Sequence, residues 1–208
     1  MRVQRLDHPL VEDHMSSLRS VESGPELFRA TVRRLSSLLV YEATRDLPVR
    51  RLSVRTPMAS LSGKQIAGRV GLVPILRAGL GMVDAVLEFL PGAEVWHLGF
   101  YRDEATLEPV EYYKKLPARR PVSVALVLDP MLATGGSAQA AIEAVRDWGV
   151  QRIKLLALLA APAGIRRVTR AFPDLDVHVC AIDRKLDRNG FIVPGLGDAG
   201  DRLFNAQA

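Results

Sequence analysis

The sequence predicts an α/β fold, in which a parallel sheet is flanked by helices. Two observations carry this prediction: short apolar runs recur from residue 70 onward, and helical stretches separate most of them. The runs are Val70–Leu76, Glu94–Tyr101, Val122–Asp129, Ile153–Ala160 and Val177–Ile182. Strands that alternate with helices form βαβ units, and continuous apolar strands are typical of a sheet that is covered on both faces. The length of 208 residues fits one domain.

The first 60 residues predict two helices and a strand. Apolar residues on one face predict a short helix over residues 9–19, with Pro9 in its first turn. A longer helix is predicted to begin after Ser23-Gly24-Pro25 and to end at about Ala43. Residues 52–55 then alternate between apolar and polar side chains, as a strand does.

The remaining segments lie between or beyond the apolar runs. Helical patterns are found over Met82–Leu90, Ser137–Trp148 and Gly164–Ala171. The charged segment Asp103–Pro121 breaks the alternation, and we expect a long loop or hairpin over a site. The final segment, Asn189–Ala208, is rich in glycine and too short for another βαβ unit.

The composition excludes several classes of protein. A single cysteine, Cys180, excludes a disulfide framework and a Cys-rich zinc module. Cys180 and His178 alternate with apolar residues, and we interpret the pair as strand packing rather than as metal ligands. The longest apolar run, Leu155–Pro162, is far shorter than the roughly 20 residues of a membrane span. The first residues lack the apolar run of a signal peptide, so we expect a cytoplasmic protein.

The charge balance is modestly basic. The net charge is +5, from 28 basic and 23 acidic residues, and the basic residues are spread along the chain. Nucleic acid and a small anionic ligand explain this balance equally well.

The strongest local signal is the segment Val122–Ser137, which reads VSVALVLDPMLATGGS. A buried strand ends in Asp129, and a loop of small residues then leads into a helix. Ligands bind beyond the carboxyl ends of strands in an open α/β sheet, and the N–H groups of a helix N-terminus attract anions. The loop is therefore a candidate phosphate cradle with a carboxylate beside it. The alternative is a strand-turn-helix connection whose glycines only make the turn tight.

Two other phosphate motifs are rejected. Gly63-Lys64-Gln65 lacks the Ser or Thr that follows the lysine of a Walker loop, and no glycine lies five residues before Gly63. Gly195–Gly200 fits G-x-G-x-x-G by its letters. A dinucleotide fingerprint needs an acidic residue about 20 positions further on, and only eight residues follow Gly200.

Several separated motifs resemble the uracil phosphoribosyltransferase family of the type I phosphoribosyltransferase superfamily. VLDPMLATGGS resembles the loop that binds 5-phosphoribosyl 1-pyrophosphate (PRPP), with Pro130 where most of the superfamily has a second acidic residue. The segments 5–10, 74–79 and 191–200 also look like this family. The resemblance covers essentially the whole chain and implies one phosphoribosyltransferase domain, residues 1–208. Its core would span about residues 65–185, and about 1–60 and 186–208 would supply a small base-binding hood.

The resemblance implies that the loop and two arginines bind PRPP. Asp129 would bond the ribose hydroxyls, Arg77 would contact PRPP, and Arg102 would cover the site on closure; these three are the candidate catalytic residues. The implied PRPP-binding set is Arg77, Arg102, Asp129, Pro130, Met131, Leu132, Ala133, Thr134, Gly135, Gly136, Ser137 and Asp198. Without the resemblance, either arginine would be interpreted as a surface charge.

The resemblance also implies that Ile192, Gly197, Asp198 and Ala199 bind uracil. One edge of uracil presents an acceptor, a donor and an acceptor, and backbone amides and carbonyls can contact it where no bulky side chain intervenes. Ile192 would pack on the ring. Taken alone, this segment is a glycine-rich C-terminal turn.

The implied activity is glycosyl transfer from PRPP to uracil, which yields UMP and pyrophosphate in pyrimidine salvage. Catalysis would consist largely of positioning and electrostatic stabilisation. Mg²⁺ is the implied cofactor, bridging pyrophosphate and ribose oxygens with water and few protein ligands, and no protein metal ligand is assigned. Family members are dimers or larger, and GTP activates some bacterial relatives, so the resemblance implies a homodimer or higher homo-oligomer and an allosteric enzyme with GTP as its activator.

The sequence is also compatible with two rival functions. The first is transfer to another base, although Pro130 and the C-terminal loop argue against a purine. The second is a PRPP-sensing pyrimidine regulator that binds RNA. The dispersed basic residues argue against this regulator, and we expect no nucleic acid partner and no membrane partner.

Overall fold

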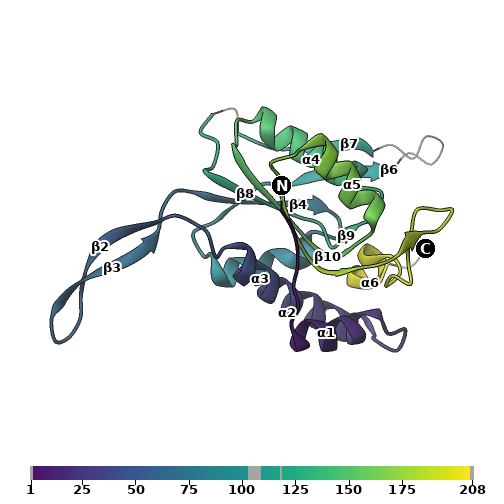
Figure 1. The fold of residues 1–208 in the computed structure, drawn as a ribbon, viewed down its shortest axis with the longest axis horizontal. Helices are drawn as coiled ribbons and strands as arrows, with labels where there is room; N and C mark the ends of the chain where they lie inside the picture. The colour runs from purple at the N-terminus through teal and green to yellow at the C-terminus, as the bar shows by residue number, and fades with distance from the viewer. Residues whose placement is uncertain (1, 103–108, 118, 207–208) are drawn as a thin grey trace.

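The centre of the molecule is a mainly parallel sheet (Figure 1). The computed structural model describes residues 2–102, 109–117 and 119–206, without the side chains of Arg2, Arg102 and Pro109. In sheet order, the strands are β1 (Arg2–Arg5), β11 (Asp176–Ile182), β10 (Arg152–Ala160), β8 (Val124–Leu128), β4 (Val70–Leu76), β6 (Leu98–Arg102) and β7 (Pro109–Lys114). Two short strands, β5 (Glu94–Val95) and β9 (Met131–Leu132), pair with β4 and β10. Among these pairs only β6 and β7 are antiparallel.

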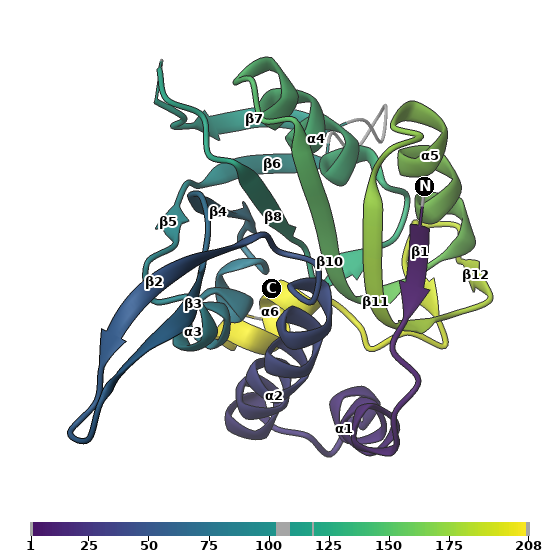
Figure 2. The same cartoon turned by 60° about the vertical axis from the view of Figure 1, so that its left-hand side comes forward.

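Helices cover both faces of the sheet (Figures 1 and 2). One face carries α1 (Pro9–Arg19), α2 (Pro25–Ala43), α3 (Leu80–Phe89) and α6 (Ala199–Phe204), and the other carries α4 (Gly136–Asp147) and α5 (Pro162–Ala171). Successive side chains of a strand point to opposite faces. Leu126 and Leu128 accordingly pack with the first helix group, whereas Ala125 and Val127 pack with the second. The predicted α/β class, with a sheet buried on both faces, is confirmed.

Most elements lie where the sequence predicts them. The helices α1 and α2 have the predicted bounds, and β4 spans the predicted residues 70–76. The predicted strand 94–101 is interrupted at residues 96–97, which separates β5 from β6. The segment 103–121 was predicted to be a loop or hairpin, and β7 indeed runs back along β6; residues 103–108 and 118 lie outside the described part of the chain. No helix within the described ranges is long and apolar enough to cross a membrane.

Three features were not predicted. β1 is an edge strand parallel to β11, so the first residues extend the main sheet. β2 (Val49–Arg55) is longer than the predicted strand and pairs with β3 (Ser60–Ile66) in an antiparallel hairpin that projects from the molecule (Figure 1). The C-terminal segment forms the hairpin of β12 (Lys185–Leu186) and β13 (Ile192–Val193), followed by α6. These segments are short or largely polar, so no apolar run marks them.

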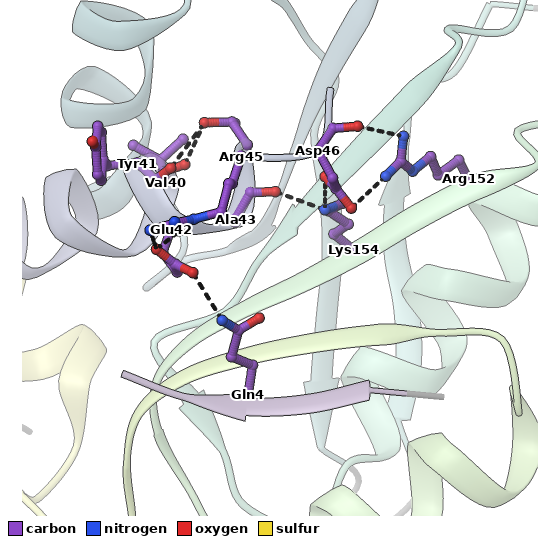
Figure 3. Close-up of polar contacts among 10 residues, drawn as sticks. Gln4, Val40, Tyr41, Glu42, Ala43, Arg45, Asp46, Arg152 and Lys154 are labelled. Carbon is purple, nitrogen blue, oxygen red and sulfur yellow. Dashed lines mark hydrogen bonds and ion pairs between the residues drawn. The ribbon is translucent and has the colours of Figure 1, made fainter. Parts of the chain in front are cut away.

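A buried lysine fixes the end of α2 to the sheet (Figure 3). Lys154 of β10 is 1% exposed, and its Nζ donates to the Ala43 carbonyl at 2.7 Å and to Asp46 Oδ1 at 2.6 Å. Arg152 pairs with the other oxygen of Asp46 at 2.6 Å. Burial acts to raise the pKa of Asp46, but the contacts with Lys154 and Arg152 lower it below its ordinary value. A buried charge is costly unless it is paired, and these contacts provide the pairing.

His178 and Cys180 lie buried on β11, in agreement with the interpretation as strand packing. Burial lowers the pKa of His178 to about 4 and raises the pKa of the Cys180 thiol to about 12. Both side chains are therefore neutral at neutral pH.

Candidate active site

The candidate site lies at the carboxyl ends of β4 and β8. These neighbouring strands are parallel, with Pro74 opposite Leu128, so Arg77 and Asp129 emerge at the same edge of the sheet. The chain after β4 continues into α3 on one face, whereas the chain after β8 continues into α4 on the other. Such a reversal is a topological switch point, where open α/β sheets bind their ligands.

The loop after β8 joins the sheet to the N-terminus of α4, in the strand-loop-helix order that the sequence predicts. It leads through β9 to Gly135, which has a φ of +82° and precedes the first turn of α4. A Cβ on Gly135 would lie 2.9 Å from the Gly164 carbonyl oxygen, so the close approach of α5 requires glycine there. No side chain caps α4, which leaves its first N–H groups facing the loop. Anions are stabilised at such a helix end.

Asp129 stands beside this loop and is half-buried. Burial raises the pKa of its carboxyl to about 6, against the opposing effect of the Met131 N–H, which donates to Oδ1 at 3.2 Å. The carboxylate is therefore charged at neutral pH but readily protonated below pH 6. A cation or a hydroxyl donor in front of it would favour the charged form.

Arg77 follows β4 and reaches across to the C-terminal helix. Its Nη2 donates to Asp201 Oδ1 at 2.9 Å, and the side chain remains 57% exposed. The Leu76–Arg77 peptide bond is cis. Arg77 thus presents a cation at the edge of the site while its partner, Asp201, holds it from the other side.

The C-terminal loop faces the cradle. After β13 the Val193–Pro194 bond is cis, and Gly195 and Gly197 both have positive φ, at +67° and +79°. Asp198 then begins α6, and its carboxylate accepts the N–H of Asp201 at 2.8 Å. The short helix α6 lies against α2, as Figure 2 shows.

The cradle, Arg77 and the C-terminal loop enclose one open cleft of about 370 Å³. Residues from all three segments line it: Arg77, Ala78, Met131, Ala133, Ser137, Gly190, Phe191, Ile192, Gly197, Asp198, Ala199 and Gly200. The structure therefore brings together eight of the residues singled out from the sequence, although some 60 residues separate the cradle from the C-terminal loop.

The other residues of the candidate set do not line this cleft. Pro130 and Leu132 are buried, and their carbonyls accept the N–H groups of Leu159 and Ala161 at 3.0 and 2.9 Å, so they tie the loop to β10. Thr134, Gly135 and Gly136 lie at the turn into α4, and Asp129 lies at the start of the loop, directly after β8. Arg102 ends β6, and its side chain lies outside the described part of the structure.

The two rejected motifs have other positions in the fold. Gly63 and Lys64 lie within β3 of the projecting hairpin, so they form no phosphate loop. Gly195–Gly200 connects the two-residue strand β13 to α6 outside the main sheet. Of its three glycines, Gly197 and Gly200 line the cleft.

Sequence reasoning did not single out several residues of the cleft. Ala78, Gly190, Phe191 and Gly200 line it, and Asp201 pairs with Arg77. Phe191 and Gly200 belong to a motif that carried the family resemblance, which was the available signal. The ion pair of Arg77 with Asp201 joins positions 124 residues apart, and no local pattern marks it.

A parallel sheet with this loop at its switch point defines a type I phosphoribosyltransferase fold. A hypoxanthine phosphoribosyltransferase from Staphylococcus aureus, in its tetragonal crystal form, superposes with a TM-score of 0.52 at 12% identity over 76% of each chain. The AQ2163 protein from Aquifex aeolicus superposes far more closely, with a TM-score of 0.94 at 35% identity over 99% of each chain.

Within this class, the chain belongs to the uracil phosphoribosyltransferase family, whose model matches residues 5–206. A uracil phosphoribosyltransferase from Roseiflexus sp. (strain RS-1) is 57% identical over 197 residues, 95% of each chain. That of Alkaliphilus oremlandii (strain OhILAs) is 52% identical over 207 residues, 99% of each chain. The resemblance that the sequence motifs suggested is confirmed.

Proposed function

We propose that the chain transfers the phosphoribosyl group of PRPP to uracil, producing UMP and pyrophosphate in pyrimidine salvage. One observation supports this most directly: a single cleft is lined on one side by the phosphate cradle and on the other by the C-terminal loop. A bisubstrate reaction needs this arrangement, because holding both reactants together removes much of the entropic barrier.

In this proposal the cradle, Asp129 and two arginines bind PRPP. The 5′-phosphate occupies the loop before α4, where Ser137 lines the cleft and the N-cap residue Gly135 provides no side-chain cap to the helix. Positive charge develops on the ribose ring as its bond to pyrophosphate breaks, and the Asp129 carboxylate stabilises that charge while accepting ribose hydroxyls. Arg77 faces the departing pyrophosphate, which gains negative charge.

Uracil then occupies the opposite wall. Gly197, Asp198 and Ala199 contact its polar edge through their backbone, and Ile192 packs on the ring. Asp198 lies between the two substrates and also contacts PRPP. Backbone groups suit this task because a folded loop holds their donors and acceptors in fixed directions.

Mg²⁺ fits this site as an ion that arrives with PRPP. Among the described residues, no three His, Cys, Asp or Glu side chains come together as a metal cage. Asp129 offers one half-buried carboxylate with a raised pKa, and a divalent cation would favour its charged form. Mg²⁺ usually takes one or two carboxylates together with water and phosphate oxygens, and it would neutralise charge on the leaving group.

The assembly we propose is one domain over residues 1–208 that pairs with a second copy. The N-terminal helices and the segment 186–208 would form the base-binding hood over the sheet. The projecting β2–β3 hairpin exposes Met58 (93%), Val49 (55%) and Leu61 (51%), apolar side chains that a second copy would cover. Activation by GTP is a separate proposal, tested by adding GTP to the same activity assay.

A crystal structure with uracil and PRPP tests the site assignments. We expect the base against Gly197–Ala199 and the 5′-phosphate within hydrogen-bonding distance of Ser137. Uracil bound elsewhere, with the cleft filled by PRPP alone, would contradict the proposed base site.

Replacing Arg102 with alanine is expected to lower kcat/KM for PRPP about tenfold, because a hydrogen bond to a charged group contributes about 1.5 kcal/mol or more. The melting temperature should change by no more than a change of about 0.5 kcal/mol in the free energy of unfolding would produce, because the proposed role of Arg102 is to contact PRPP and not to support the fold. The measurement is steady-state kinetics with PRPP varied. The exposed Arg170 on α5 provides the control variant, Arg170→Ala. An equal kcat/KM for PRPP in Arg102→Ala and the wild type would show that Arg102 does not contact PRPP in the reaction.

A further inference from the structure

An ion pair between the half-buried Arg19 and the buried Asp183 lies against the C-terminal loop. Asp183, which follows β11, is 7% exposed, and Arg19 is the last residue of α1. Arg19 donates from Nη1 to Asp183 Oδ2 at 2.7 Å and from Nη2 to Oδ1 at 2.8 Å. Burial acts to raise the pKa of Asp183, but hydrogen bonds from Arg19 and from the Gly195 N–H lower it below its ordinary value. The pair is therefore charged, bidentate and well satisfied.

Both backbone groups of Gly195 bind to this pair. Its N–H donates to Asp183 Oδ2 at 2.8 Å, and its carbonyl accepts from Arg19 Nη1 at 2.8 Å. A Cβ on Gly195 would lie 2.0 Å from the Ile192 carbonyl oxygen, so a side chain there cannot fit this turn. Gly195 is thus fixed from two sides, two residues before Gly197 reaches the cleft.

A second arginine fixes the next peptide unit. Arg202 of α6 donates to the carbonyls of Leu196, Leu18 and Ser20 at 2.8, 2.9 and 2.7 Å. Its guanidinium lies 4.3 Å from the centre of the Phe28 ring. The C-terminal loop and the end of α1 therefore form one connected unit. Within this unit, only the pair of Arg19 with Asp183 binds both the backbone N–H and the backbone carbonyl of a single loop residue, Gly195.

We propose that Arg19 and Asp183 are positioning residues for base selection, which act by fixing Gly195. This inference rests on the proposed base-binding loop. Neither side chain is among the residues that line the cleft, so their effect reaches the base only through the loop backbone. Hydrogen bonds weaken steeply with misalignment, so a loop that discriminates between bases must hold its N–H and carbonyl groups closely in place.

The substitution Arg19→Lys tests this role. Lysine keeps a positive charge beside Asp183 but lacks the planar fork that contacts both carboxylate oxygens and the Gly195 carbonyl. We expect the KM for uracil to rise about tenfold, and the preference for uracil over cytosine in kcat/KM to fall about tenfold. The KM for PRPP should rise by no more than about twofold, because the cradle and Arg77, which supply most of the proposed PRPP contacts, are untouched and only the contact from Asp198 lies in the loop. Asp183→Asn keeps the shape of the side chain but removes its charge. It is expected to raise the KM for uracil in the same way and to leave the KM for PRPP nearly unchanged.

Arg69→Lys is the matched control. Arg69 makes the same set of contacts at the amino end of β4, away from the cleft: it donates to both oxygens of Glu94 at 2.7 and 2.8 Å and to the Arg120 carbonyl at 3.1 Å. Both KM values should stay unchanged in this variant. An unchanged KM for uracil in Arg19→Lys and Asp183→Asn would overturn the proposal, as would equal increases in both KM values.

Gly197→Ala separates this failure from a failure of the proposed base site. A side chain at Gly197, where φ is +79°, strains the loop at the cleft itself. If Gly197→Ala raises the KM for uracil and Arg19→Lys does not, the base site stands and the positioning role is wrong. If neither variant changes it, the loop does not bind the base.

Discussion

Replacing Asp129 with asparagine is expected to lower kcat about 100-fold while the folded chain becomes more stable. Asparagine keeps the shape and one acceptor oxygen but removes the negative charge opposite the developing ribose cation. A loss of about 2.7 kcal/mol is typical for one electrostatic contact to a transition state. The interaction strengthens only as the bond breaks, so kcat and kcat/KM should fall together.

The stability of the same variant follows from the pKa of Asp129. Its value of about 6 in the folded chain lies above the ordinary 3.8, so the folded chain binds more protons than the unfolded chain between those values. The free energy of unfolding therefore decreases as the pH rises from about 4 to about 6. Above pH 6 the charged carboxylate lowers the free energy of unfolding of the ligand-free protein by about 1–3 kcal/mol. Asparagine carries no charge, so the variant does not lose this stability.

Steady-state kinetics, a melting curve and a pH profile test these expectations together. In the wild type, kcat/KM for PRPP should decrease below pH 6, because that parameter reports the groups of the free enzyme, and the decrease should be absent in Asp129→Asn. Asp147→Asn, an exposed change at the end of α4, is the control and should change nothing. A lowered melting temperature with kcat intact would show that Asp129 supports the loop and not the reaction.

Cytosine is expected to react with a kcat/KM about 10²–10⁴ lower than that of uracil. It carries an amino group in place of the O4 acceptor and lacks the N3 proton. The backbone of Gly197–Ala199 would then face two mismatched groups within a partly enclosed cleft, and each mismatch costs roughly 1–3 kcal/mol.

The measurement is pyrophosphate release from PRPP with each base at several concentrations. Because the penalty falls on binding of the base, the KM for PRPP should be similar with both bases. Similar rates with uracil and cytosine would show that Gly197–Ala199 does not discriminate at this edge.

The parts of the fold that follow from the sequence are those in which burial dictates the residue pattern. β8 is apolar at every position because helices cover both of its sides, and its run was visible without any structure. The bounds of α1 were predicted because Pro9 marks its first turn, and α2 begins at Pro25, the last residue of the Ser23-Gly24-Pro25 segment after which its start was predicted. The projecting strand β3 was missed because it is mostly exposed and polar, so its pairing leaves no periodic apolar signal.

The candidate site also has parts that the local sequence predicts and parts that it does not. The cradle was predicted from chemistry, because an acidic residue, small residues and a helix start follow one another along the chain. The C-terminal wall was predicted only through family resemblance, since Gly197–Ala199 alone is an ordinary turn. The pair of Arg19 with Asp183 joins positions 164 residues apart and appears only once α1 and β11 are placed side by side.

Formation of UMP from labelled uracil and PRPP, with and without an RNA competitor, tests the central claim most directly. The account predicts that UMP and pyrophosphate appear in equal amounts, that both require uracil and Mg²⁺, and that RNA leaves the rate unchanged. Failure to form UMP, in a protein that binds PRPP and is displaced from it by RNA, would contradict the enzymatic function and favour a PRPP-sensing regulator.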